Sequence, residues 1–370
     1  MGARTRDERI QGGVERMMRA PVRSLKQRLD GRAIVRVLVV IVLLALASAL
    51  AGAWWIDRWL DQPIATLDEK QVFEVPRGSS LKAVGASLHR SGLLDHPRIW
   101  VGWARVLNRS QSLKAGEYAL EPGLTPRSLL DLLSSGRVLL HSITFIEGST
   151  FADVRNALIT NEAVDSQYAE RTGDEIMAAL GAPGAHPEGQ FFPDTYHFPR
   201  GTSDVQLLGI AYRRMQSELQ TAWDQRLPDL PLASPYEALI LASIVEKETA
   251  LDSERPAVAG VFIERLRRGM RLQTDPTVIY GMLDRFDGNI RRADLRRDTP
   301  YNTYTRAGLP PTPIAMPSLD SLRAATRPEV TGALFFVATG EPDGSHYFSK
   351  TLAEHDAAVK RYLRKLRERQ

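Results

Sequence analysis

Two glutamates at the end of an apolar segment are the residues in this chain best placed for acid catalysis. Residues 234–249 read SPYEALILASIVEKET, and Ser234 with Glu237 forms the Ser-x-x-Glu pattern of a helix N-terminus. A helix turns about 100° per residue, so Glu248 continues an apolar stripe while Glu246 lies about 200° away from it. The stripe is formed by Leu241, Ile244 and Val245.

A carboxyl group on an apolar helix face has two readings. It is either a hydrogen-bonded structural group or an acid whose pKa is raised by its surroundings. The spacing alone leaves both readings open, and we take the acid as the hypothesis for Glu248. Glu246 and Lys247 are interpreted as structural or surface residues.

Three further stretches combine aromatic rings with amide, hydroxyl and carboxyl groups. They read EGQFFPDTY (188–196), LQTDPTVIYG (272–281) and YNTYT (301–305). Sugars present apolar ring faces and a rim of hydroxyl groups, so this mixture suits a carbohydrate ligand. Each stretch taken singly is also compatible with ordinary turns, because Asp-Pro and Asn-Thr pairs are common there.

Taken together and in order, these motifs resemble a known family. EGQFFPDTY, ASIVEKET, RLQTDPTVIYG and YNTYTRAGLPPTPIAMP are similar to motifs of the endolytic murein transglycosylase (YceG-like) family. The resemblance covers nearly everything after the N-terminal arm. It implies lytic cleavage of the MurNAc–GlcNAc bond inside nascent peptidoglycan strands, which leaves 1,6-anhydroMurNAc ends and limits strand length. It also implies that the second glutamate of the EKE motif, Glu248, is catalytic.

A single acid suffices for this reaction. Ordinary glycosidases need two carboxyl groups. In a lytic cleavage the nucleophile is the C6 hydroxyl of the sugar itself, which is already tethered beside the bond. One protonated carboxyl can donate to the glycosidic oxygen and then accept the hydroxyl proton, which requires a raised pKa.

The remaining site residues follow from the same motifs. We expect them to line the cleft, orient the sugar and stabilise positive charge on it: Gln273, Thr274, Asp275, Tyr280, Tyr301, Asn302 and Tyr304. Glu188 and Asp194 either brace a loop at the cleft wall or are purely structural. A cofactor is not expected, and a metal site is not expected because the seven histidines form no cluster.

The N-terminal region predicts a membrane anchor. Residues 37–56 contain no charged side chain, which is long enough for a hydrocarbon core of about 30 Å. Residues 1–36 carry a net charge of +6, so the positive-inside rule predicts a cytoplasmic arm and a periplasmic remainder. A cleaved signal peptide is the competing interpretation, but the apolar run exceeds the usual length of about 7–15 residues.

Composition excludes several other classes. The chain has no cysteine, which excludes disulfides, thiol catalysis and cysteine-ligated zinc. Its net charge of +4 comes from the arm, and the rest of the chain carries −2. The sequence also lacks the interleaved basic and aromatic pattern of single-strand binding, so nucleic acid is not an expected partner.

The pattern of elements predicts an α+β protein with two exported domains. We expect a linker over 57–71, a LysM-like module over 72–140 with the order strand, helix, helix, strand, and a catalytic domain over 141–370. A plain α+β packing module is an equal reading of 72–140. The partners implied are peptidoglycan strands, the bacterial inner membrane and, by analogy, wall synthases such as penicillin-binding proteins. A two-carboxylate muramidase using Glu248 with Asp275 or Asp194, and a non-catalytic wall-binding scaffold, are the rival functions.

Overall fold

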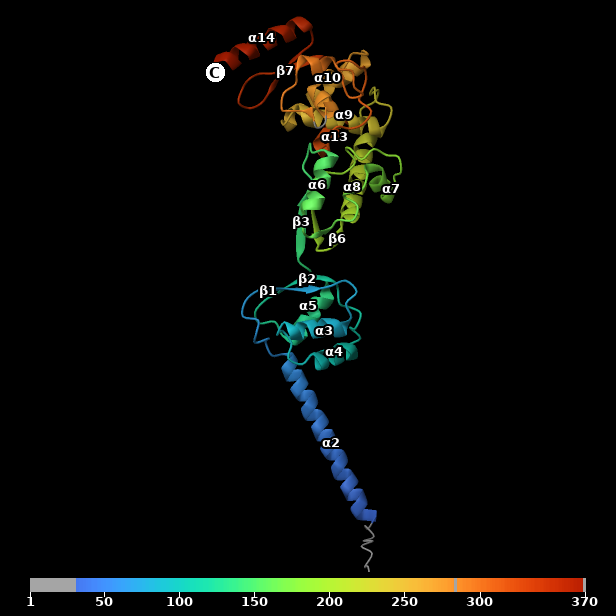
Figure 1. Ribbon diagram of the computed structural model, residues 1–370, viewed down its shortest axis with the longest axis vertical. Helices are drawn as coiled ribbons and strands as arrows, with labels where there is room; N and C mark the ends of the chain where they lie inside the picture. Colours follow the sequence, from blue (N-terminus) through green and yellow to red (C-terminus); the bar gives the residue numbers. More distant parts are fainter. Residues whose placement is uncertain (1–30, 283–284, 369–370) are drawn as a thin grey trace, which may run out of the picture.

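The computed structural model describes residues 31–282 and 285–368, and the predicted basic arm lies mostly outside them. The described chain is elongated, with one long helix, a small α+β unit and a larger α+β unit placed end to end (Figure 1). It is a mixed structure of helices and short antiparallel or parallel strand pairs. The predicted α+β class is therefore confirmed.

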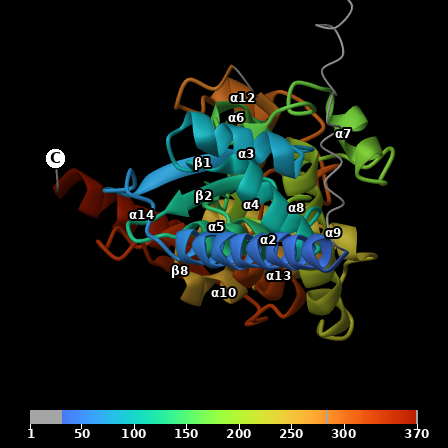
Figure 2. The ribbon, with the colours of Figure 1, turned by 90° about the horizontal axis from the view of Figure 1, so that it is seen from below.

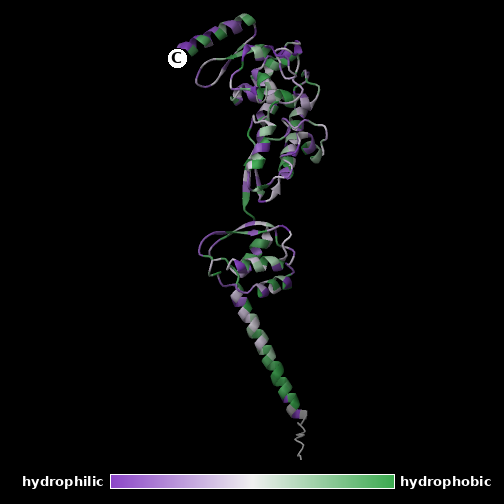
Figure 3. Ribbon diagram, viewed as in Figure 1, coloured by the Kyte–Doolittle hydropathy of each residue, from purple (hydrophilic) through white to green (hydrophobic). Residues whose placement is uncertain are grey.

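Helix α2 (Gly31–Leu60) is the apolar segment that the sequence marks as a membrane anchor. Within the described residues, one helix is long and apolar enough to cross a membrane, over Ile34–Leu60. Its side chains from Val35 to Trp55 are exposed, and Figure 3 shows that they form a hydrophobic rod. An exposed apolar rod is the pattern expected of a helix surrounded by lipid.

The helix continues past residue 56 into the segment predicted as a linker. Trp59 and Leu60 are buried in the core of the small unit. The Arg127 side chain, from α5 (Pro126–Ser135), bonds to Asp57 through Nη2 at 2.7 Å and to Asp61 through Nε at 2.6 Å. Asp57 in the last turn of α2 and Asp61 just after it thus tie the helix to α5, and α2 enters the folded unit directly.

The small unit has the predicted order of strand, helix, helix, strand. Strand β1 (Gln71–Val75) is followed by α3 (Leu81–Arg90), α4 (Pro97–Val106) and β2 (Gly116–Leu120). The strands pair antiparallel, with Gln71 opposite Leu120. Trp100 anchors the core, and its indole N–H donates to the carbonyl of Pro126 at 2.9 Å. The order of elements is confirmed, while kinship with LysM modules remains a prediction.

The larger unit begins with a layer built on a strand pair. Strand β3 (Leu140–Thr144) pairs antiparallel with β5 (Thr195–Pro199), and β4 (Val164–Asp165) pairs with β6 (Thr202–Ser203) in parallel. Helices α6 (Phe151–Thr160), α7 (Gly173–Ala179) and α8 (Asp204–Asp224) cover these strands. Glu117 of β2 joins the two units, because it accepts from Arg200 Nε at 2.7 Å and lies 2.5 Å from His141 Nε2.

The second layer is helical and surrounds α9 (Pro235–Glu248). Its neighbours include α8, α10 (Arg255–Arg267), α11 (Asp275–Met282) and α13 (Leu319–Thr326), and η1 (Asp252–Glu254) and α12 (Arg292–Arg296) lie in the connections. Strands β7 (Phe335–Ala338) and β8 (His346–Ser349) form an antiparallel hairpin. The last helix, α14 (Leu352–Glu368), projects from the end of the molecule opposite α2 (Figure 1).

Two helix glycines, Gly260 in this layer and Gly102 in the small unit, differ in how closely they are packed. A Cβ on Gly260 in α10 would lie 2.1 Å from the carbonyl oxygen of Glu329, whereas one on Gly102 in α4 would meet nothing within 4 Å. We expect Gly260→Ala to lower the free energy of unfolding by about 1–3 kcal/mol through overpacking. The same change at Gly102 should raise it by roughly 0.5–1 kcal/mol, because alanine favours helix interiors. Urea unfolding of both variants measures this, and equal effects would contradict the packing described for α10.

Candidate active site

Glu248 is the last residue of α9, a helix that the fold buries from every side. Its residues 238–245 are all buried, so the helix has no single apolar stripe. Ser234 caps the N-terminus, and its hydroxyl accepts from the N–H of Glu237 at 3.3 Å. The Glu237 carboxylate accepts from Ala233 at 2.6 Å rather than from Ser234, so the expected capping box is only half formed.

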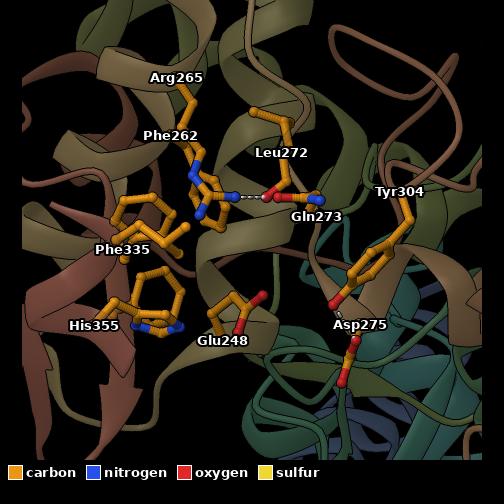
Figure 4. A pocket seen from close by; sticks show the side chains of 11 residues that line it. Glu248, Phe262, Arg265, Leu272, Gln273, Asp275, Tyr304, Phe335 and His355 are labelled. Atoms are coloured by element: carbon orange, nitrogen blue, oxygen red, sulfur yellow. Dashed lines mark hydrogen bonds between the residues drawn. The ribbon is translucent and has the colours of Figure 1, made fainter. Parts of the chain in front are cut away.

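The two glutamates of the EKE motif end in different places. Glu248 lines a pocket of about 410 Å³, shown in Figure 4. The Glu246 side chain is 5% exposed and lies outside the residues that line this pocket. Its carboxylate accepts from the Ser318 N–H at 2.9 Å and from the Ser321 hydroxyl at 2.7 Å, at the start of α13. Glu246 is therefore a buried structural carboxylate.

The pocket around Glu248 is built from four parts of the chain that are distant in sequence. Helices α9 and α10, the segment before α11, the loop containing Tyr304 and the β7–α14 region each supply a wall. The lining residues are Glu248, Phe262, Arg265, Leu272, Gln273, Asp275, Tyr304, Phe335, Phe336, Leu352 and His355. Carboxyl, amide and phenol groups thus face aromatic rings across one hollow (Figure 4).

Burial dominates the electrostatics of Glu248. Loss of water raises the pKa of its carboxyl to about 7, the hydrogen bond from Thr274 opposes this rise, and the charge of Asp275 adds to it. The Thr274 hydroxyl donates to Oε1 of Glu248. Part of the Glu248 side chain remains accessible. A carboxyl that is protonated near neutral pH and still open to a pocket can act as a general acid.

A buried arginine holds the segment that faces Glu248. Arg265 donates from Nε to the Leu334 carbonyl and from Nη1 to the Leu272 carbonyl, both at 2.7 Å. Its guanidinium lies 5.2 Å from the centre of the Phe335 ring. Gln273 has a φ of 50°, a left-handed conformation that is uncommon outside glycine and is held here by surrounding contacts.

The predicted residues of the 272–281 and 301–305 stretches divide into two groups. Gln273, Asp275 and Tyr304 line the Glu248 pocket, and the Tyr304 hydroxyl donates to Asp275 Oδ1 at 2.6 Å. Thr274 is buried beneath them and bonded to Glu248. Asn302 does not line the pocket, because its amide N–H groups bond to three backbone carbonyls and its Oδ1 accepts from the N–H of Tyr304.

Tyr280, Tyr301 and Glu188 form a separate cluster at the other end of α11. The Tyr280 hydroxyl donates to Glu188 Oε2 at 3.0 Å, and the rings of Tyr280 and Tyr301 lie 4.8 Å apart. Glu188 also accepts from the N–H of Phe151 at 3.0 Å. Burial raises the pKa of Glu188 to about 7. Glu188 and Tyr280 line a second pocket of about 680 Å³, so the structure does not bring them together with Glu248.

Asp194 is an ion-paired surface group. It bonds to Arg214 and accepts from the backbone N–H of Thr195 at 2.6 Å. The Thr195 N–H, and then Arg214, hold the pKa of Asp194 below its usual range. It does not line the Glu248 pocket.

Sequence reasoning missed the aromatic and basic wall of the pocket. The motifs of the sequence analysis do not include four residues that line the pocket, which are Phe262, Arg265, Phe335 and His355. A signal existed for Arg265, because it continues the face of α10 defined by Val258 and Phe262 at helical spacing. The wall from β7 and α14 had no local signal. Among the described residues, no group of histidine, aspartate and glutamate could hold a metal ion.

The fold and this acid-bearing pocket define a member of a known class. The YceG-like family profile matches residues 73–361, so the chain belongs to the YceG-like family. A crystal structure of a YceG-like protein from Listeria monocytogenes is 29% identical and superposes with a TM-score of 0.50. The superposition covers 78% of this chain and 98% of the Listeria chain.

Curated relatives carry one common name. An endolytic murein transglycosylase of Bacillus subtilis (strain 168) is 28% identical over 333 residues, covering 85% of this chain and 91% of the relative. Two proteins of the same name, from Streptococcus pneumoniae strains D39 and R6, are each 29% identical. The alignments with them cover 87% of this chain but 64% of each relative, so this chain spans just under two thirds of their length.

Proposed function

We propose that this protein is an endolytic lytic transglycosylase of peptidoglycan. It cleaves the MurNAc–GlcNAc bond within nascent glycan strands and leaves 1,6-anhydroMurNAc ends. The relatives' shared name supports the reaction class. The observation that carries the proposal is the Glu248 carboxyl, which has a pKa raised by burial to about 7 and lines a pocket with Gln273, Asp275 and Tyr304.

The proposed mechanism uses one carboxyl group twice. Protonated Glu248 donates its proton to the glycosidic oxygen as the bond from that oxygen to C1 of MurNAc breaks. The C6 hydroxyl of the same sugar forms the new bond to C1, and its proton passes to the Glu248 carboxylate. The acid is thereby restored and no water is consumed. Asp275 and Gln273 lie where they can orient the sugar and stabilise its positive charge.

A hydrolase with two carboxyl groups is the alternative that the pocket favours most. Asp275 lines the same pocket as Glu248 and could serve as the base for a water molecule. Asp194 is ion-paired with Arg214 outside that pocket, so it lends this alternative no support. Mass spectrometry of digested glycan strands distinguishes the two. Products with anhydro ends support the lytic reaction, and products heavier by one water per cleavage contradict it.

The anchor and its surroundings complete the proposal. We propose that α2 spans the inner membrane once, with the basic arm in the cytoplasm and the catalytic domain in the periplasm. Because α2 runs directly into the small unit, that unit would lie next to the membrane. An enzyme anchored in this way would act where strands are made, and we propose that it limits strand length and works beside wall synthases.

The pH dependence of the reaction provides a direct test of the acid. Because the active form of Glu248 is protonated and its pKa is about 7, kcat/KM should fall about tenfold for each pH unit above 7. Glu188, with a similar pKa in the other pocket, provides the matched control. In the Glu188→Gln variant, kcat/KM should still fall above pH 7. If kcat/KM no longer fell in that variant, the titrating group would be Glu188 and not Glu248.

The same raised pKa has an effect on stability whose sign can be stated. Glu248 binds its proton more tightly in the folded chain than at the ordinary pKa of 4.5. Its contribution to the free energy of unfolding is therefore fully present below about pH 4.5 and is lost as the pH rises to about 7. Glu248→Gln should reduce this loss, which urea unfolding at pH 4.5 and pH 7.5 can measure. A loss of the same size in the variant would contradict the assignment.

A further inference from the structure

His355 lines the same pocket as Glu248, and the mechanism above gives it no role. It lies in the first turn of α14, and Figure 4 shows its ring beside the Glu248 side chain. The ring stacks on Phe335 with centroids 5.1 Å apart and an angle of 24° between the planes. This stacking holds the plane of the ring against the pocket wall.

The two ring nitrogens of His355 have different surroundings. Nδ1 is buried and has no hydrogen-bond partner in the part of the chain that the structure describes. Burial lowers the pKa of His355, the charge of Asp356 opposes this shift and the charge of Arg265 adds to it, so the pKa lies below its usual value and the neutral ring is favoured at neutral pH. A neutral imidazole has one N–H donor and one acceptor nitrogen.

The unpartnered nitrogen indicates the tautomer. Buried N–H groups without a partner are rarer in proteins than acceptors without one. The form with the proton on Nδ1 would bury an unused donor, so the form with the proton on Nε2 is favoured. His355 then presents a neutral N–H donor from the only ring nitrogen that remains able to face the pocket.

Several of the other donors of the pocket wall are already engaged. Arg265 uses Nε and Nη1 on backbone carbonyls, the Thr274 hydroxyl donates to Glu248, and the Tyr304 hydroxyl donates to Asp275. A ligand that enters with a carbonyl oxygen therefore has His355 Nε2, the Gln273 amide and the Nη2 group of Arg265 as its side-chain donors, and His355 is the neutral ring among them. In the proposed substrate, the strongest neutral acceptor on each sugar ring is the carbonyl of the N-acetyl group.

We propose that His355 donates a hydrogen bond from Nε2 to the acetamido carbonyl of the sugar bound beside Glu248. This inference rests on the proposed function, because it takes the substrate to be a glycan of N-acetylated sugars. His355 is then a residue that selects N-acetylated strands. Its contact exists before the chemical step, so its loss should appear in binding as well as in turnover.

The test compares two replacements of the ring in chains that bind but do not cleave. His355→Phe retains the stacking on Phe335 and removes the donor, whereas His355→Gln retains an N–H donor and removes the aromatic ring. Each is combined with Glu248→Gln. Binding is measured by calorimetry with glycan strands stripped of peptides by an amidase, and with the same strands after N-deacetylation.

We expect His355→Phe to weaken binding of the acetylated strands about tenfold, the upper range for one neutral hydrogen bond, and to leave the deacetylated strands unaffected. His355→Gln should recover most of the loss. Equal binding of acetylated strands by the Phe variant, with an unchanged melting temperature, would overturn the inference and leave His355 as a packing residue. A preference for acetylated strands that survives in the Phe variant would overturn it as well.

Failure of this inference can be separated from failure of the proposed function. If the protein with Glu248 and His355 intact forms no anhydro ends, the proposed function fails. If it forms them, and His355→Phe does so with the same KM and kcat, only the role of His355 is wrong.

Discussion

Replacing Glu248 by glutamine is expected to lower the rate of strand cleavage by about a thousandfold, because general acid catalysis typically contributes about 10²–10⁴. Glutamine has nearly the same shape but cannot transfer a proton. The change also removes a buried acid whose ionisation opposes folding. We therefore expect the variant to fold and to bind glycan strands as the unmodified chain does, with loss confined to turnover.

The measurement is release of anhydro ends from purified glycan strands, with binding and melting temperature recorded on the same samples. Lys247→Ala is the matched control, since Lys247 is the exposed neighbour of Glu248 and donates to the Gly148 carbonyl at 3.0 Å. The control should retain full turnover. Substantial cleavage by Glu248→Gln would leave the proposed mechanism without its acid, and a non-catalytic scaffold predicts that the variant keeps its cellular function.

Replacing Glu246 by alanine is expected to lower the stability of the protein strongly while leaving the turnover of folded molecules nearly unchanged. Its carboxylate accepts from the N–H and hydroxyl of Ser318 and from the hydroxyl of Ser321, and it faces Arg255 at 3.4 Å. The Arg255 side chain is 7% exposed. Removing the carboxylate leaves these serine donors without their acceptor and leaves Asp252 as the remaining acidic partner of Arg255. We expect a loss of about 3 kcal/mol, since each buried donor left unpaired costs about 1–3 kcal/mol.

Urea unfolding of Glu246→Ala at pH 7.5 measures this loss, with Lys247→Ala again as the control. At a temperature where the variant is folded, cleavage per folded molecule should stay within a few fold of the unmodified chain. A stable Glu246→Ala variant that cannot cleave would reverse the roles of the two acids. The two experiments therefore show which glutamate of the EKE motif is needed for cleavage and which is needed for stability.

The positions of Glu248 and Glu246 show what the sequence predicts about this site and where the reason for the prediction is incomplete. Helical winding predicts that Glu248 and Glu246 point to different places, and in the structure Glu248 lines the pocket while Glu246 is hydrogen-bonded at the start of α13. The stated reason was incomplete, because α9 is buried all round and Glu246 lies in a buried environment too. What distinguishes them is the partner each finds. Glu246 meets the N-terminus of α13 from 72 residues away, and Glu248 meets a pocket.

The predicted site residues were only partly brought together. Gln273, Asp275 and Tyr304 share the Glu248 pocket, whereas Tyr280 and Tyr301 lie at the far end of α11. Asp275 and Tyr280 are five positions apart, which is about 7.5 Å along a helix. The order of residues in a motif does not show that its two halves line different pockets.

The sequence by itself determined the helix that ends in the acid, the order of elements in the small unit, the apolar anchor segment and the motifs that contain the acid. These depend on local spacing, capping residues and hydrophobic periodicity, which are written along the chain. Only the tertiary structure decided that α2 continues into the small unit, that Asn302 serves its own loop, and that Arg265, Phe335 and His355 form the opposite wall. Those features depend on which segments of the folded chain pack against each other. Burial, and with it the raised pKa of Glu248, comes from segments up to about a hundred residues away.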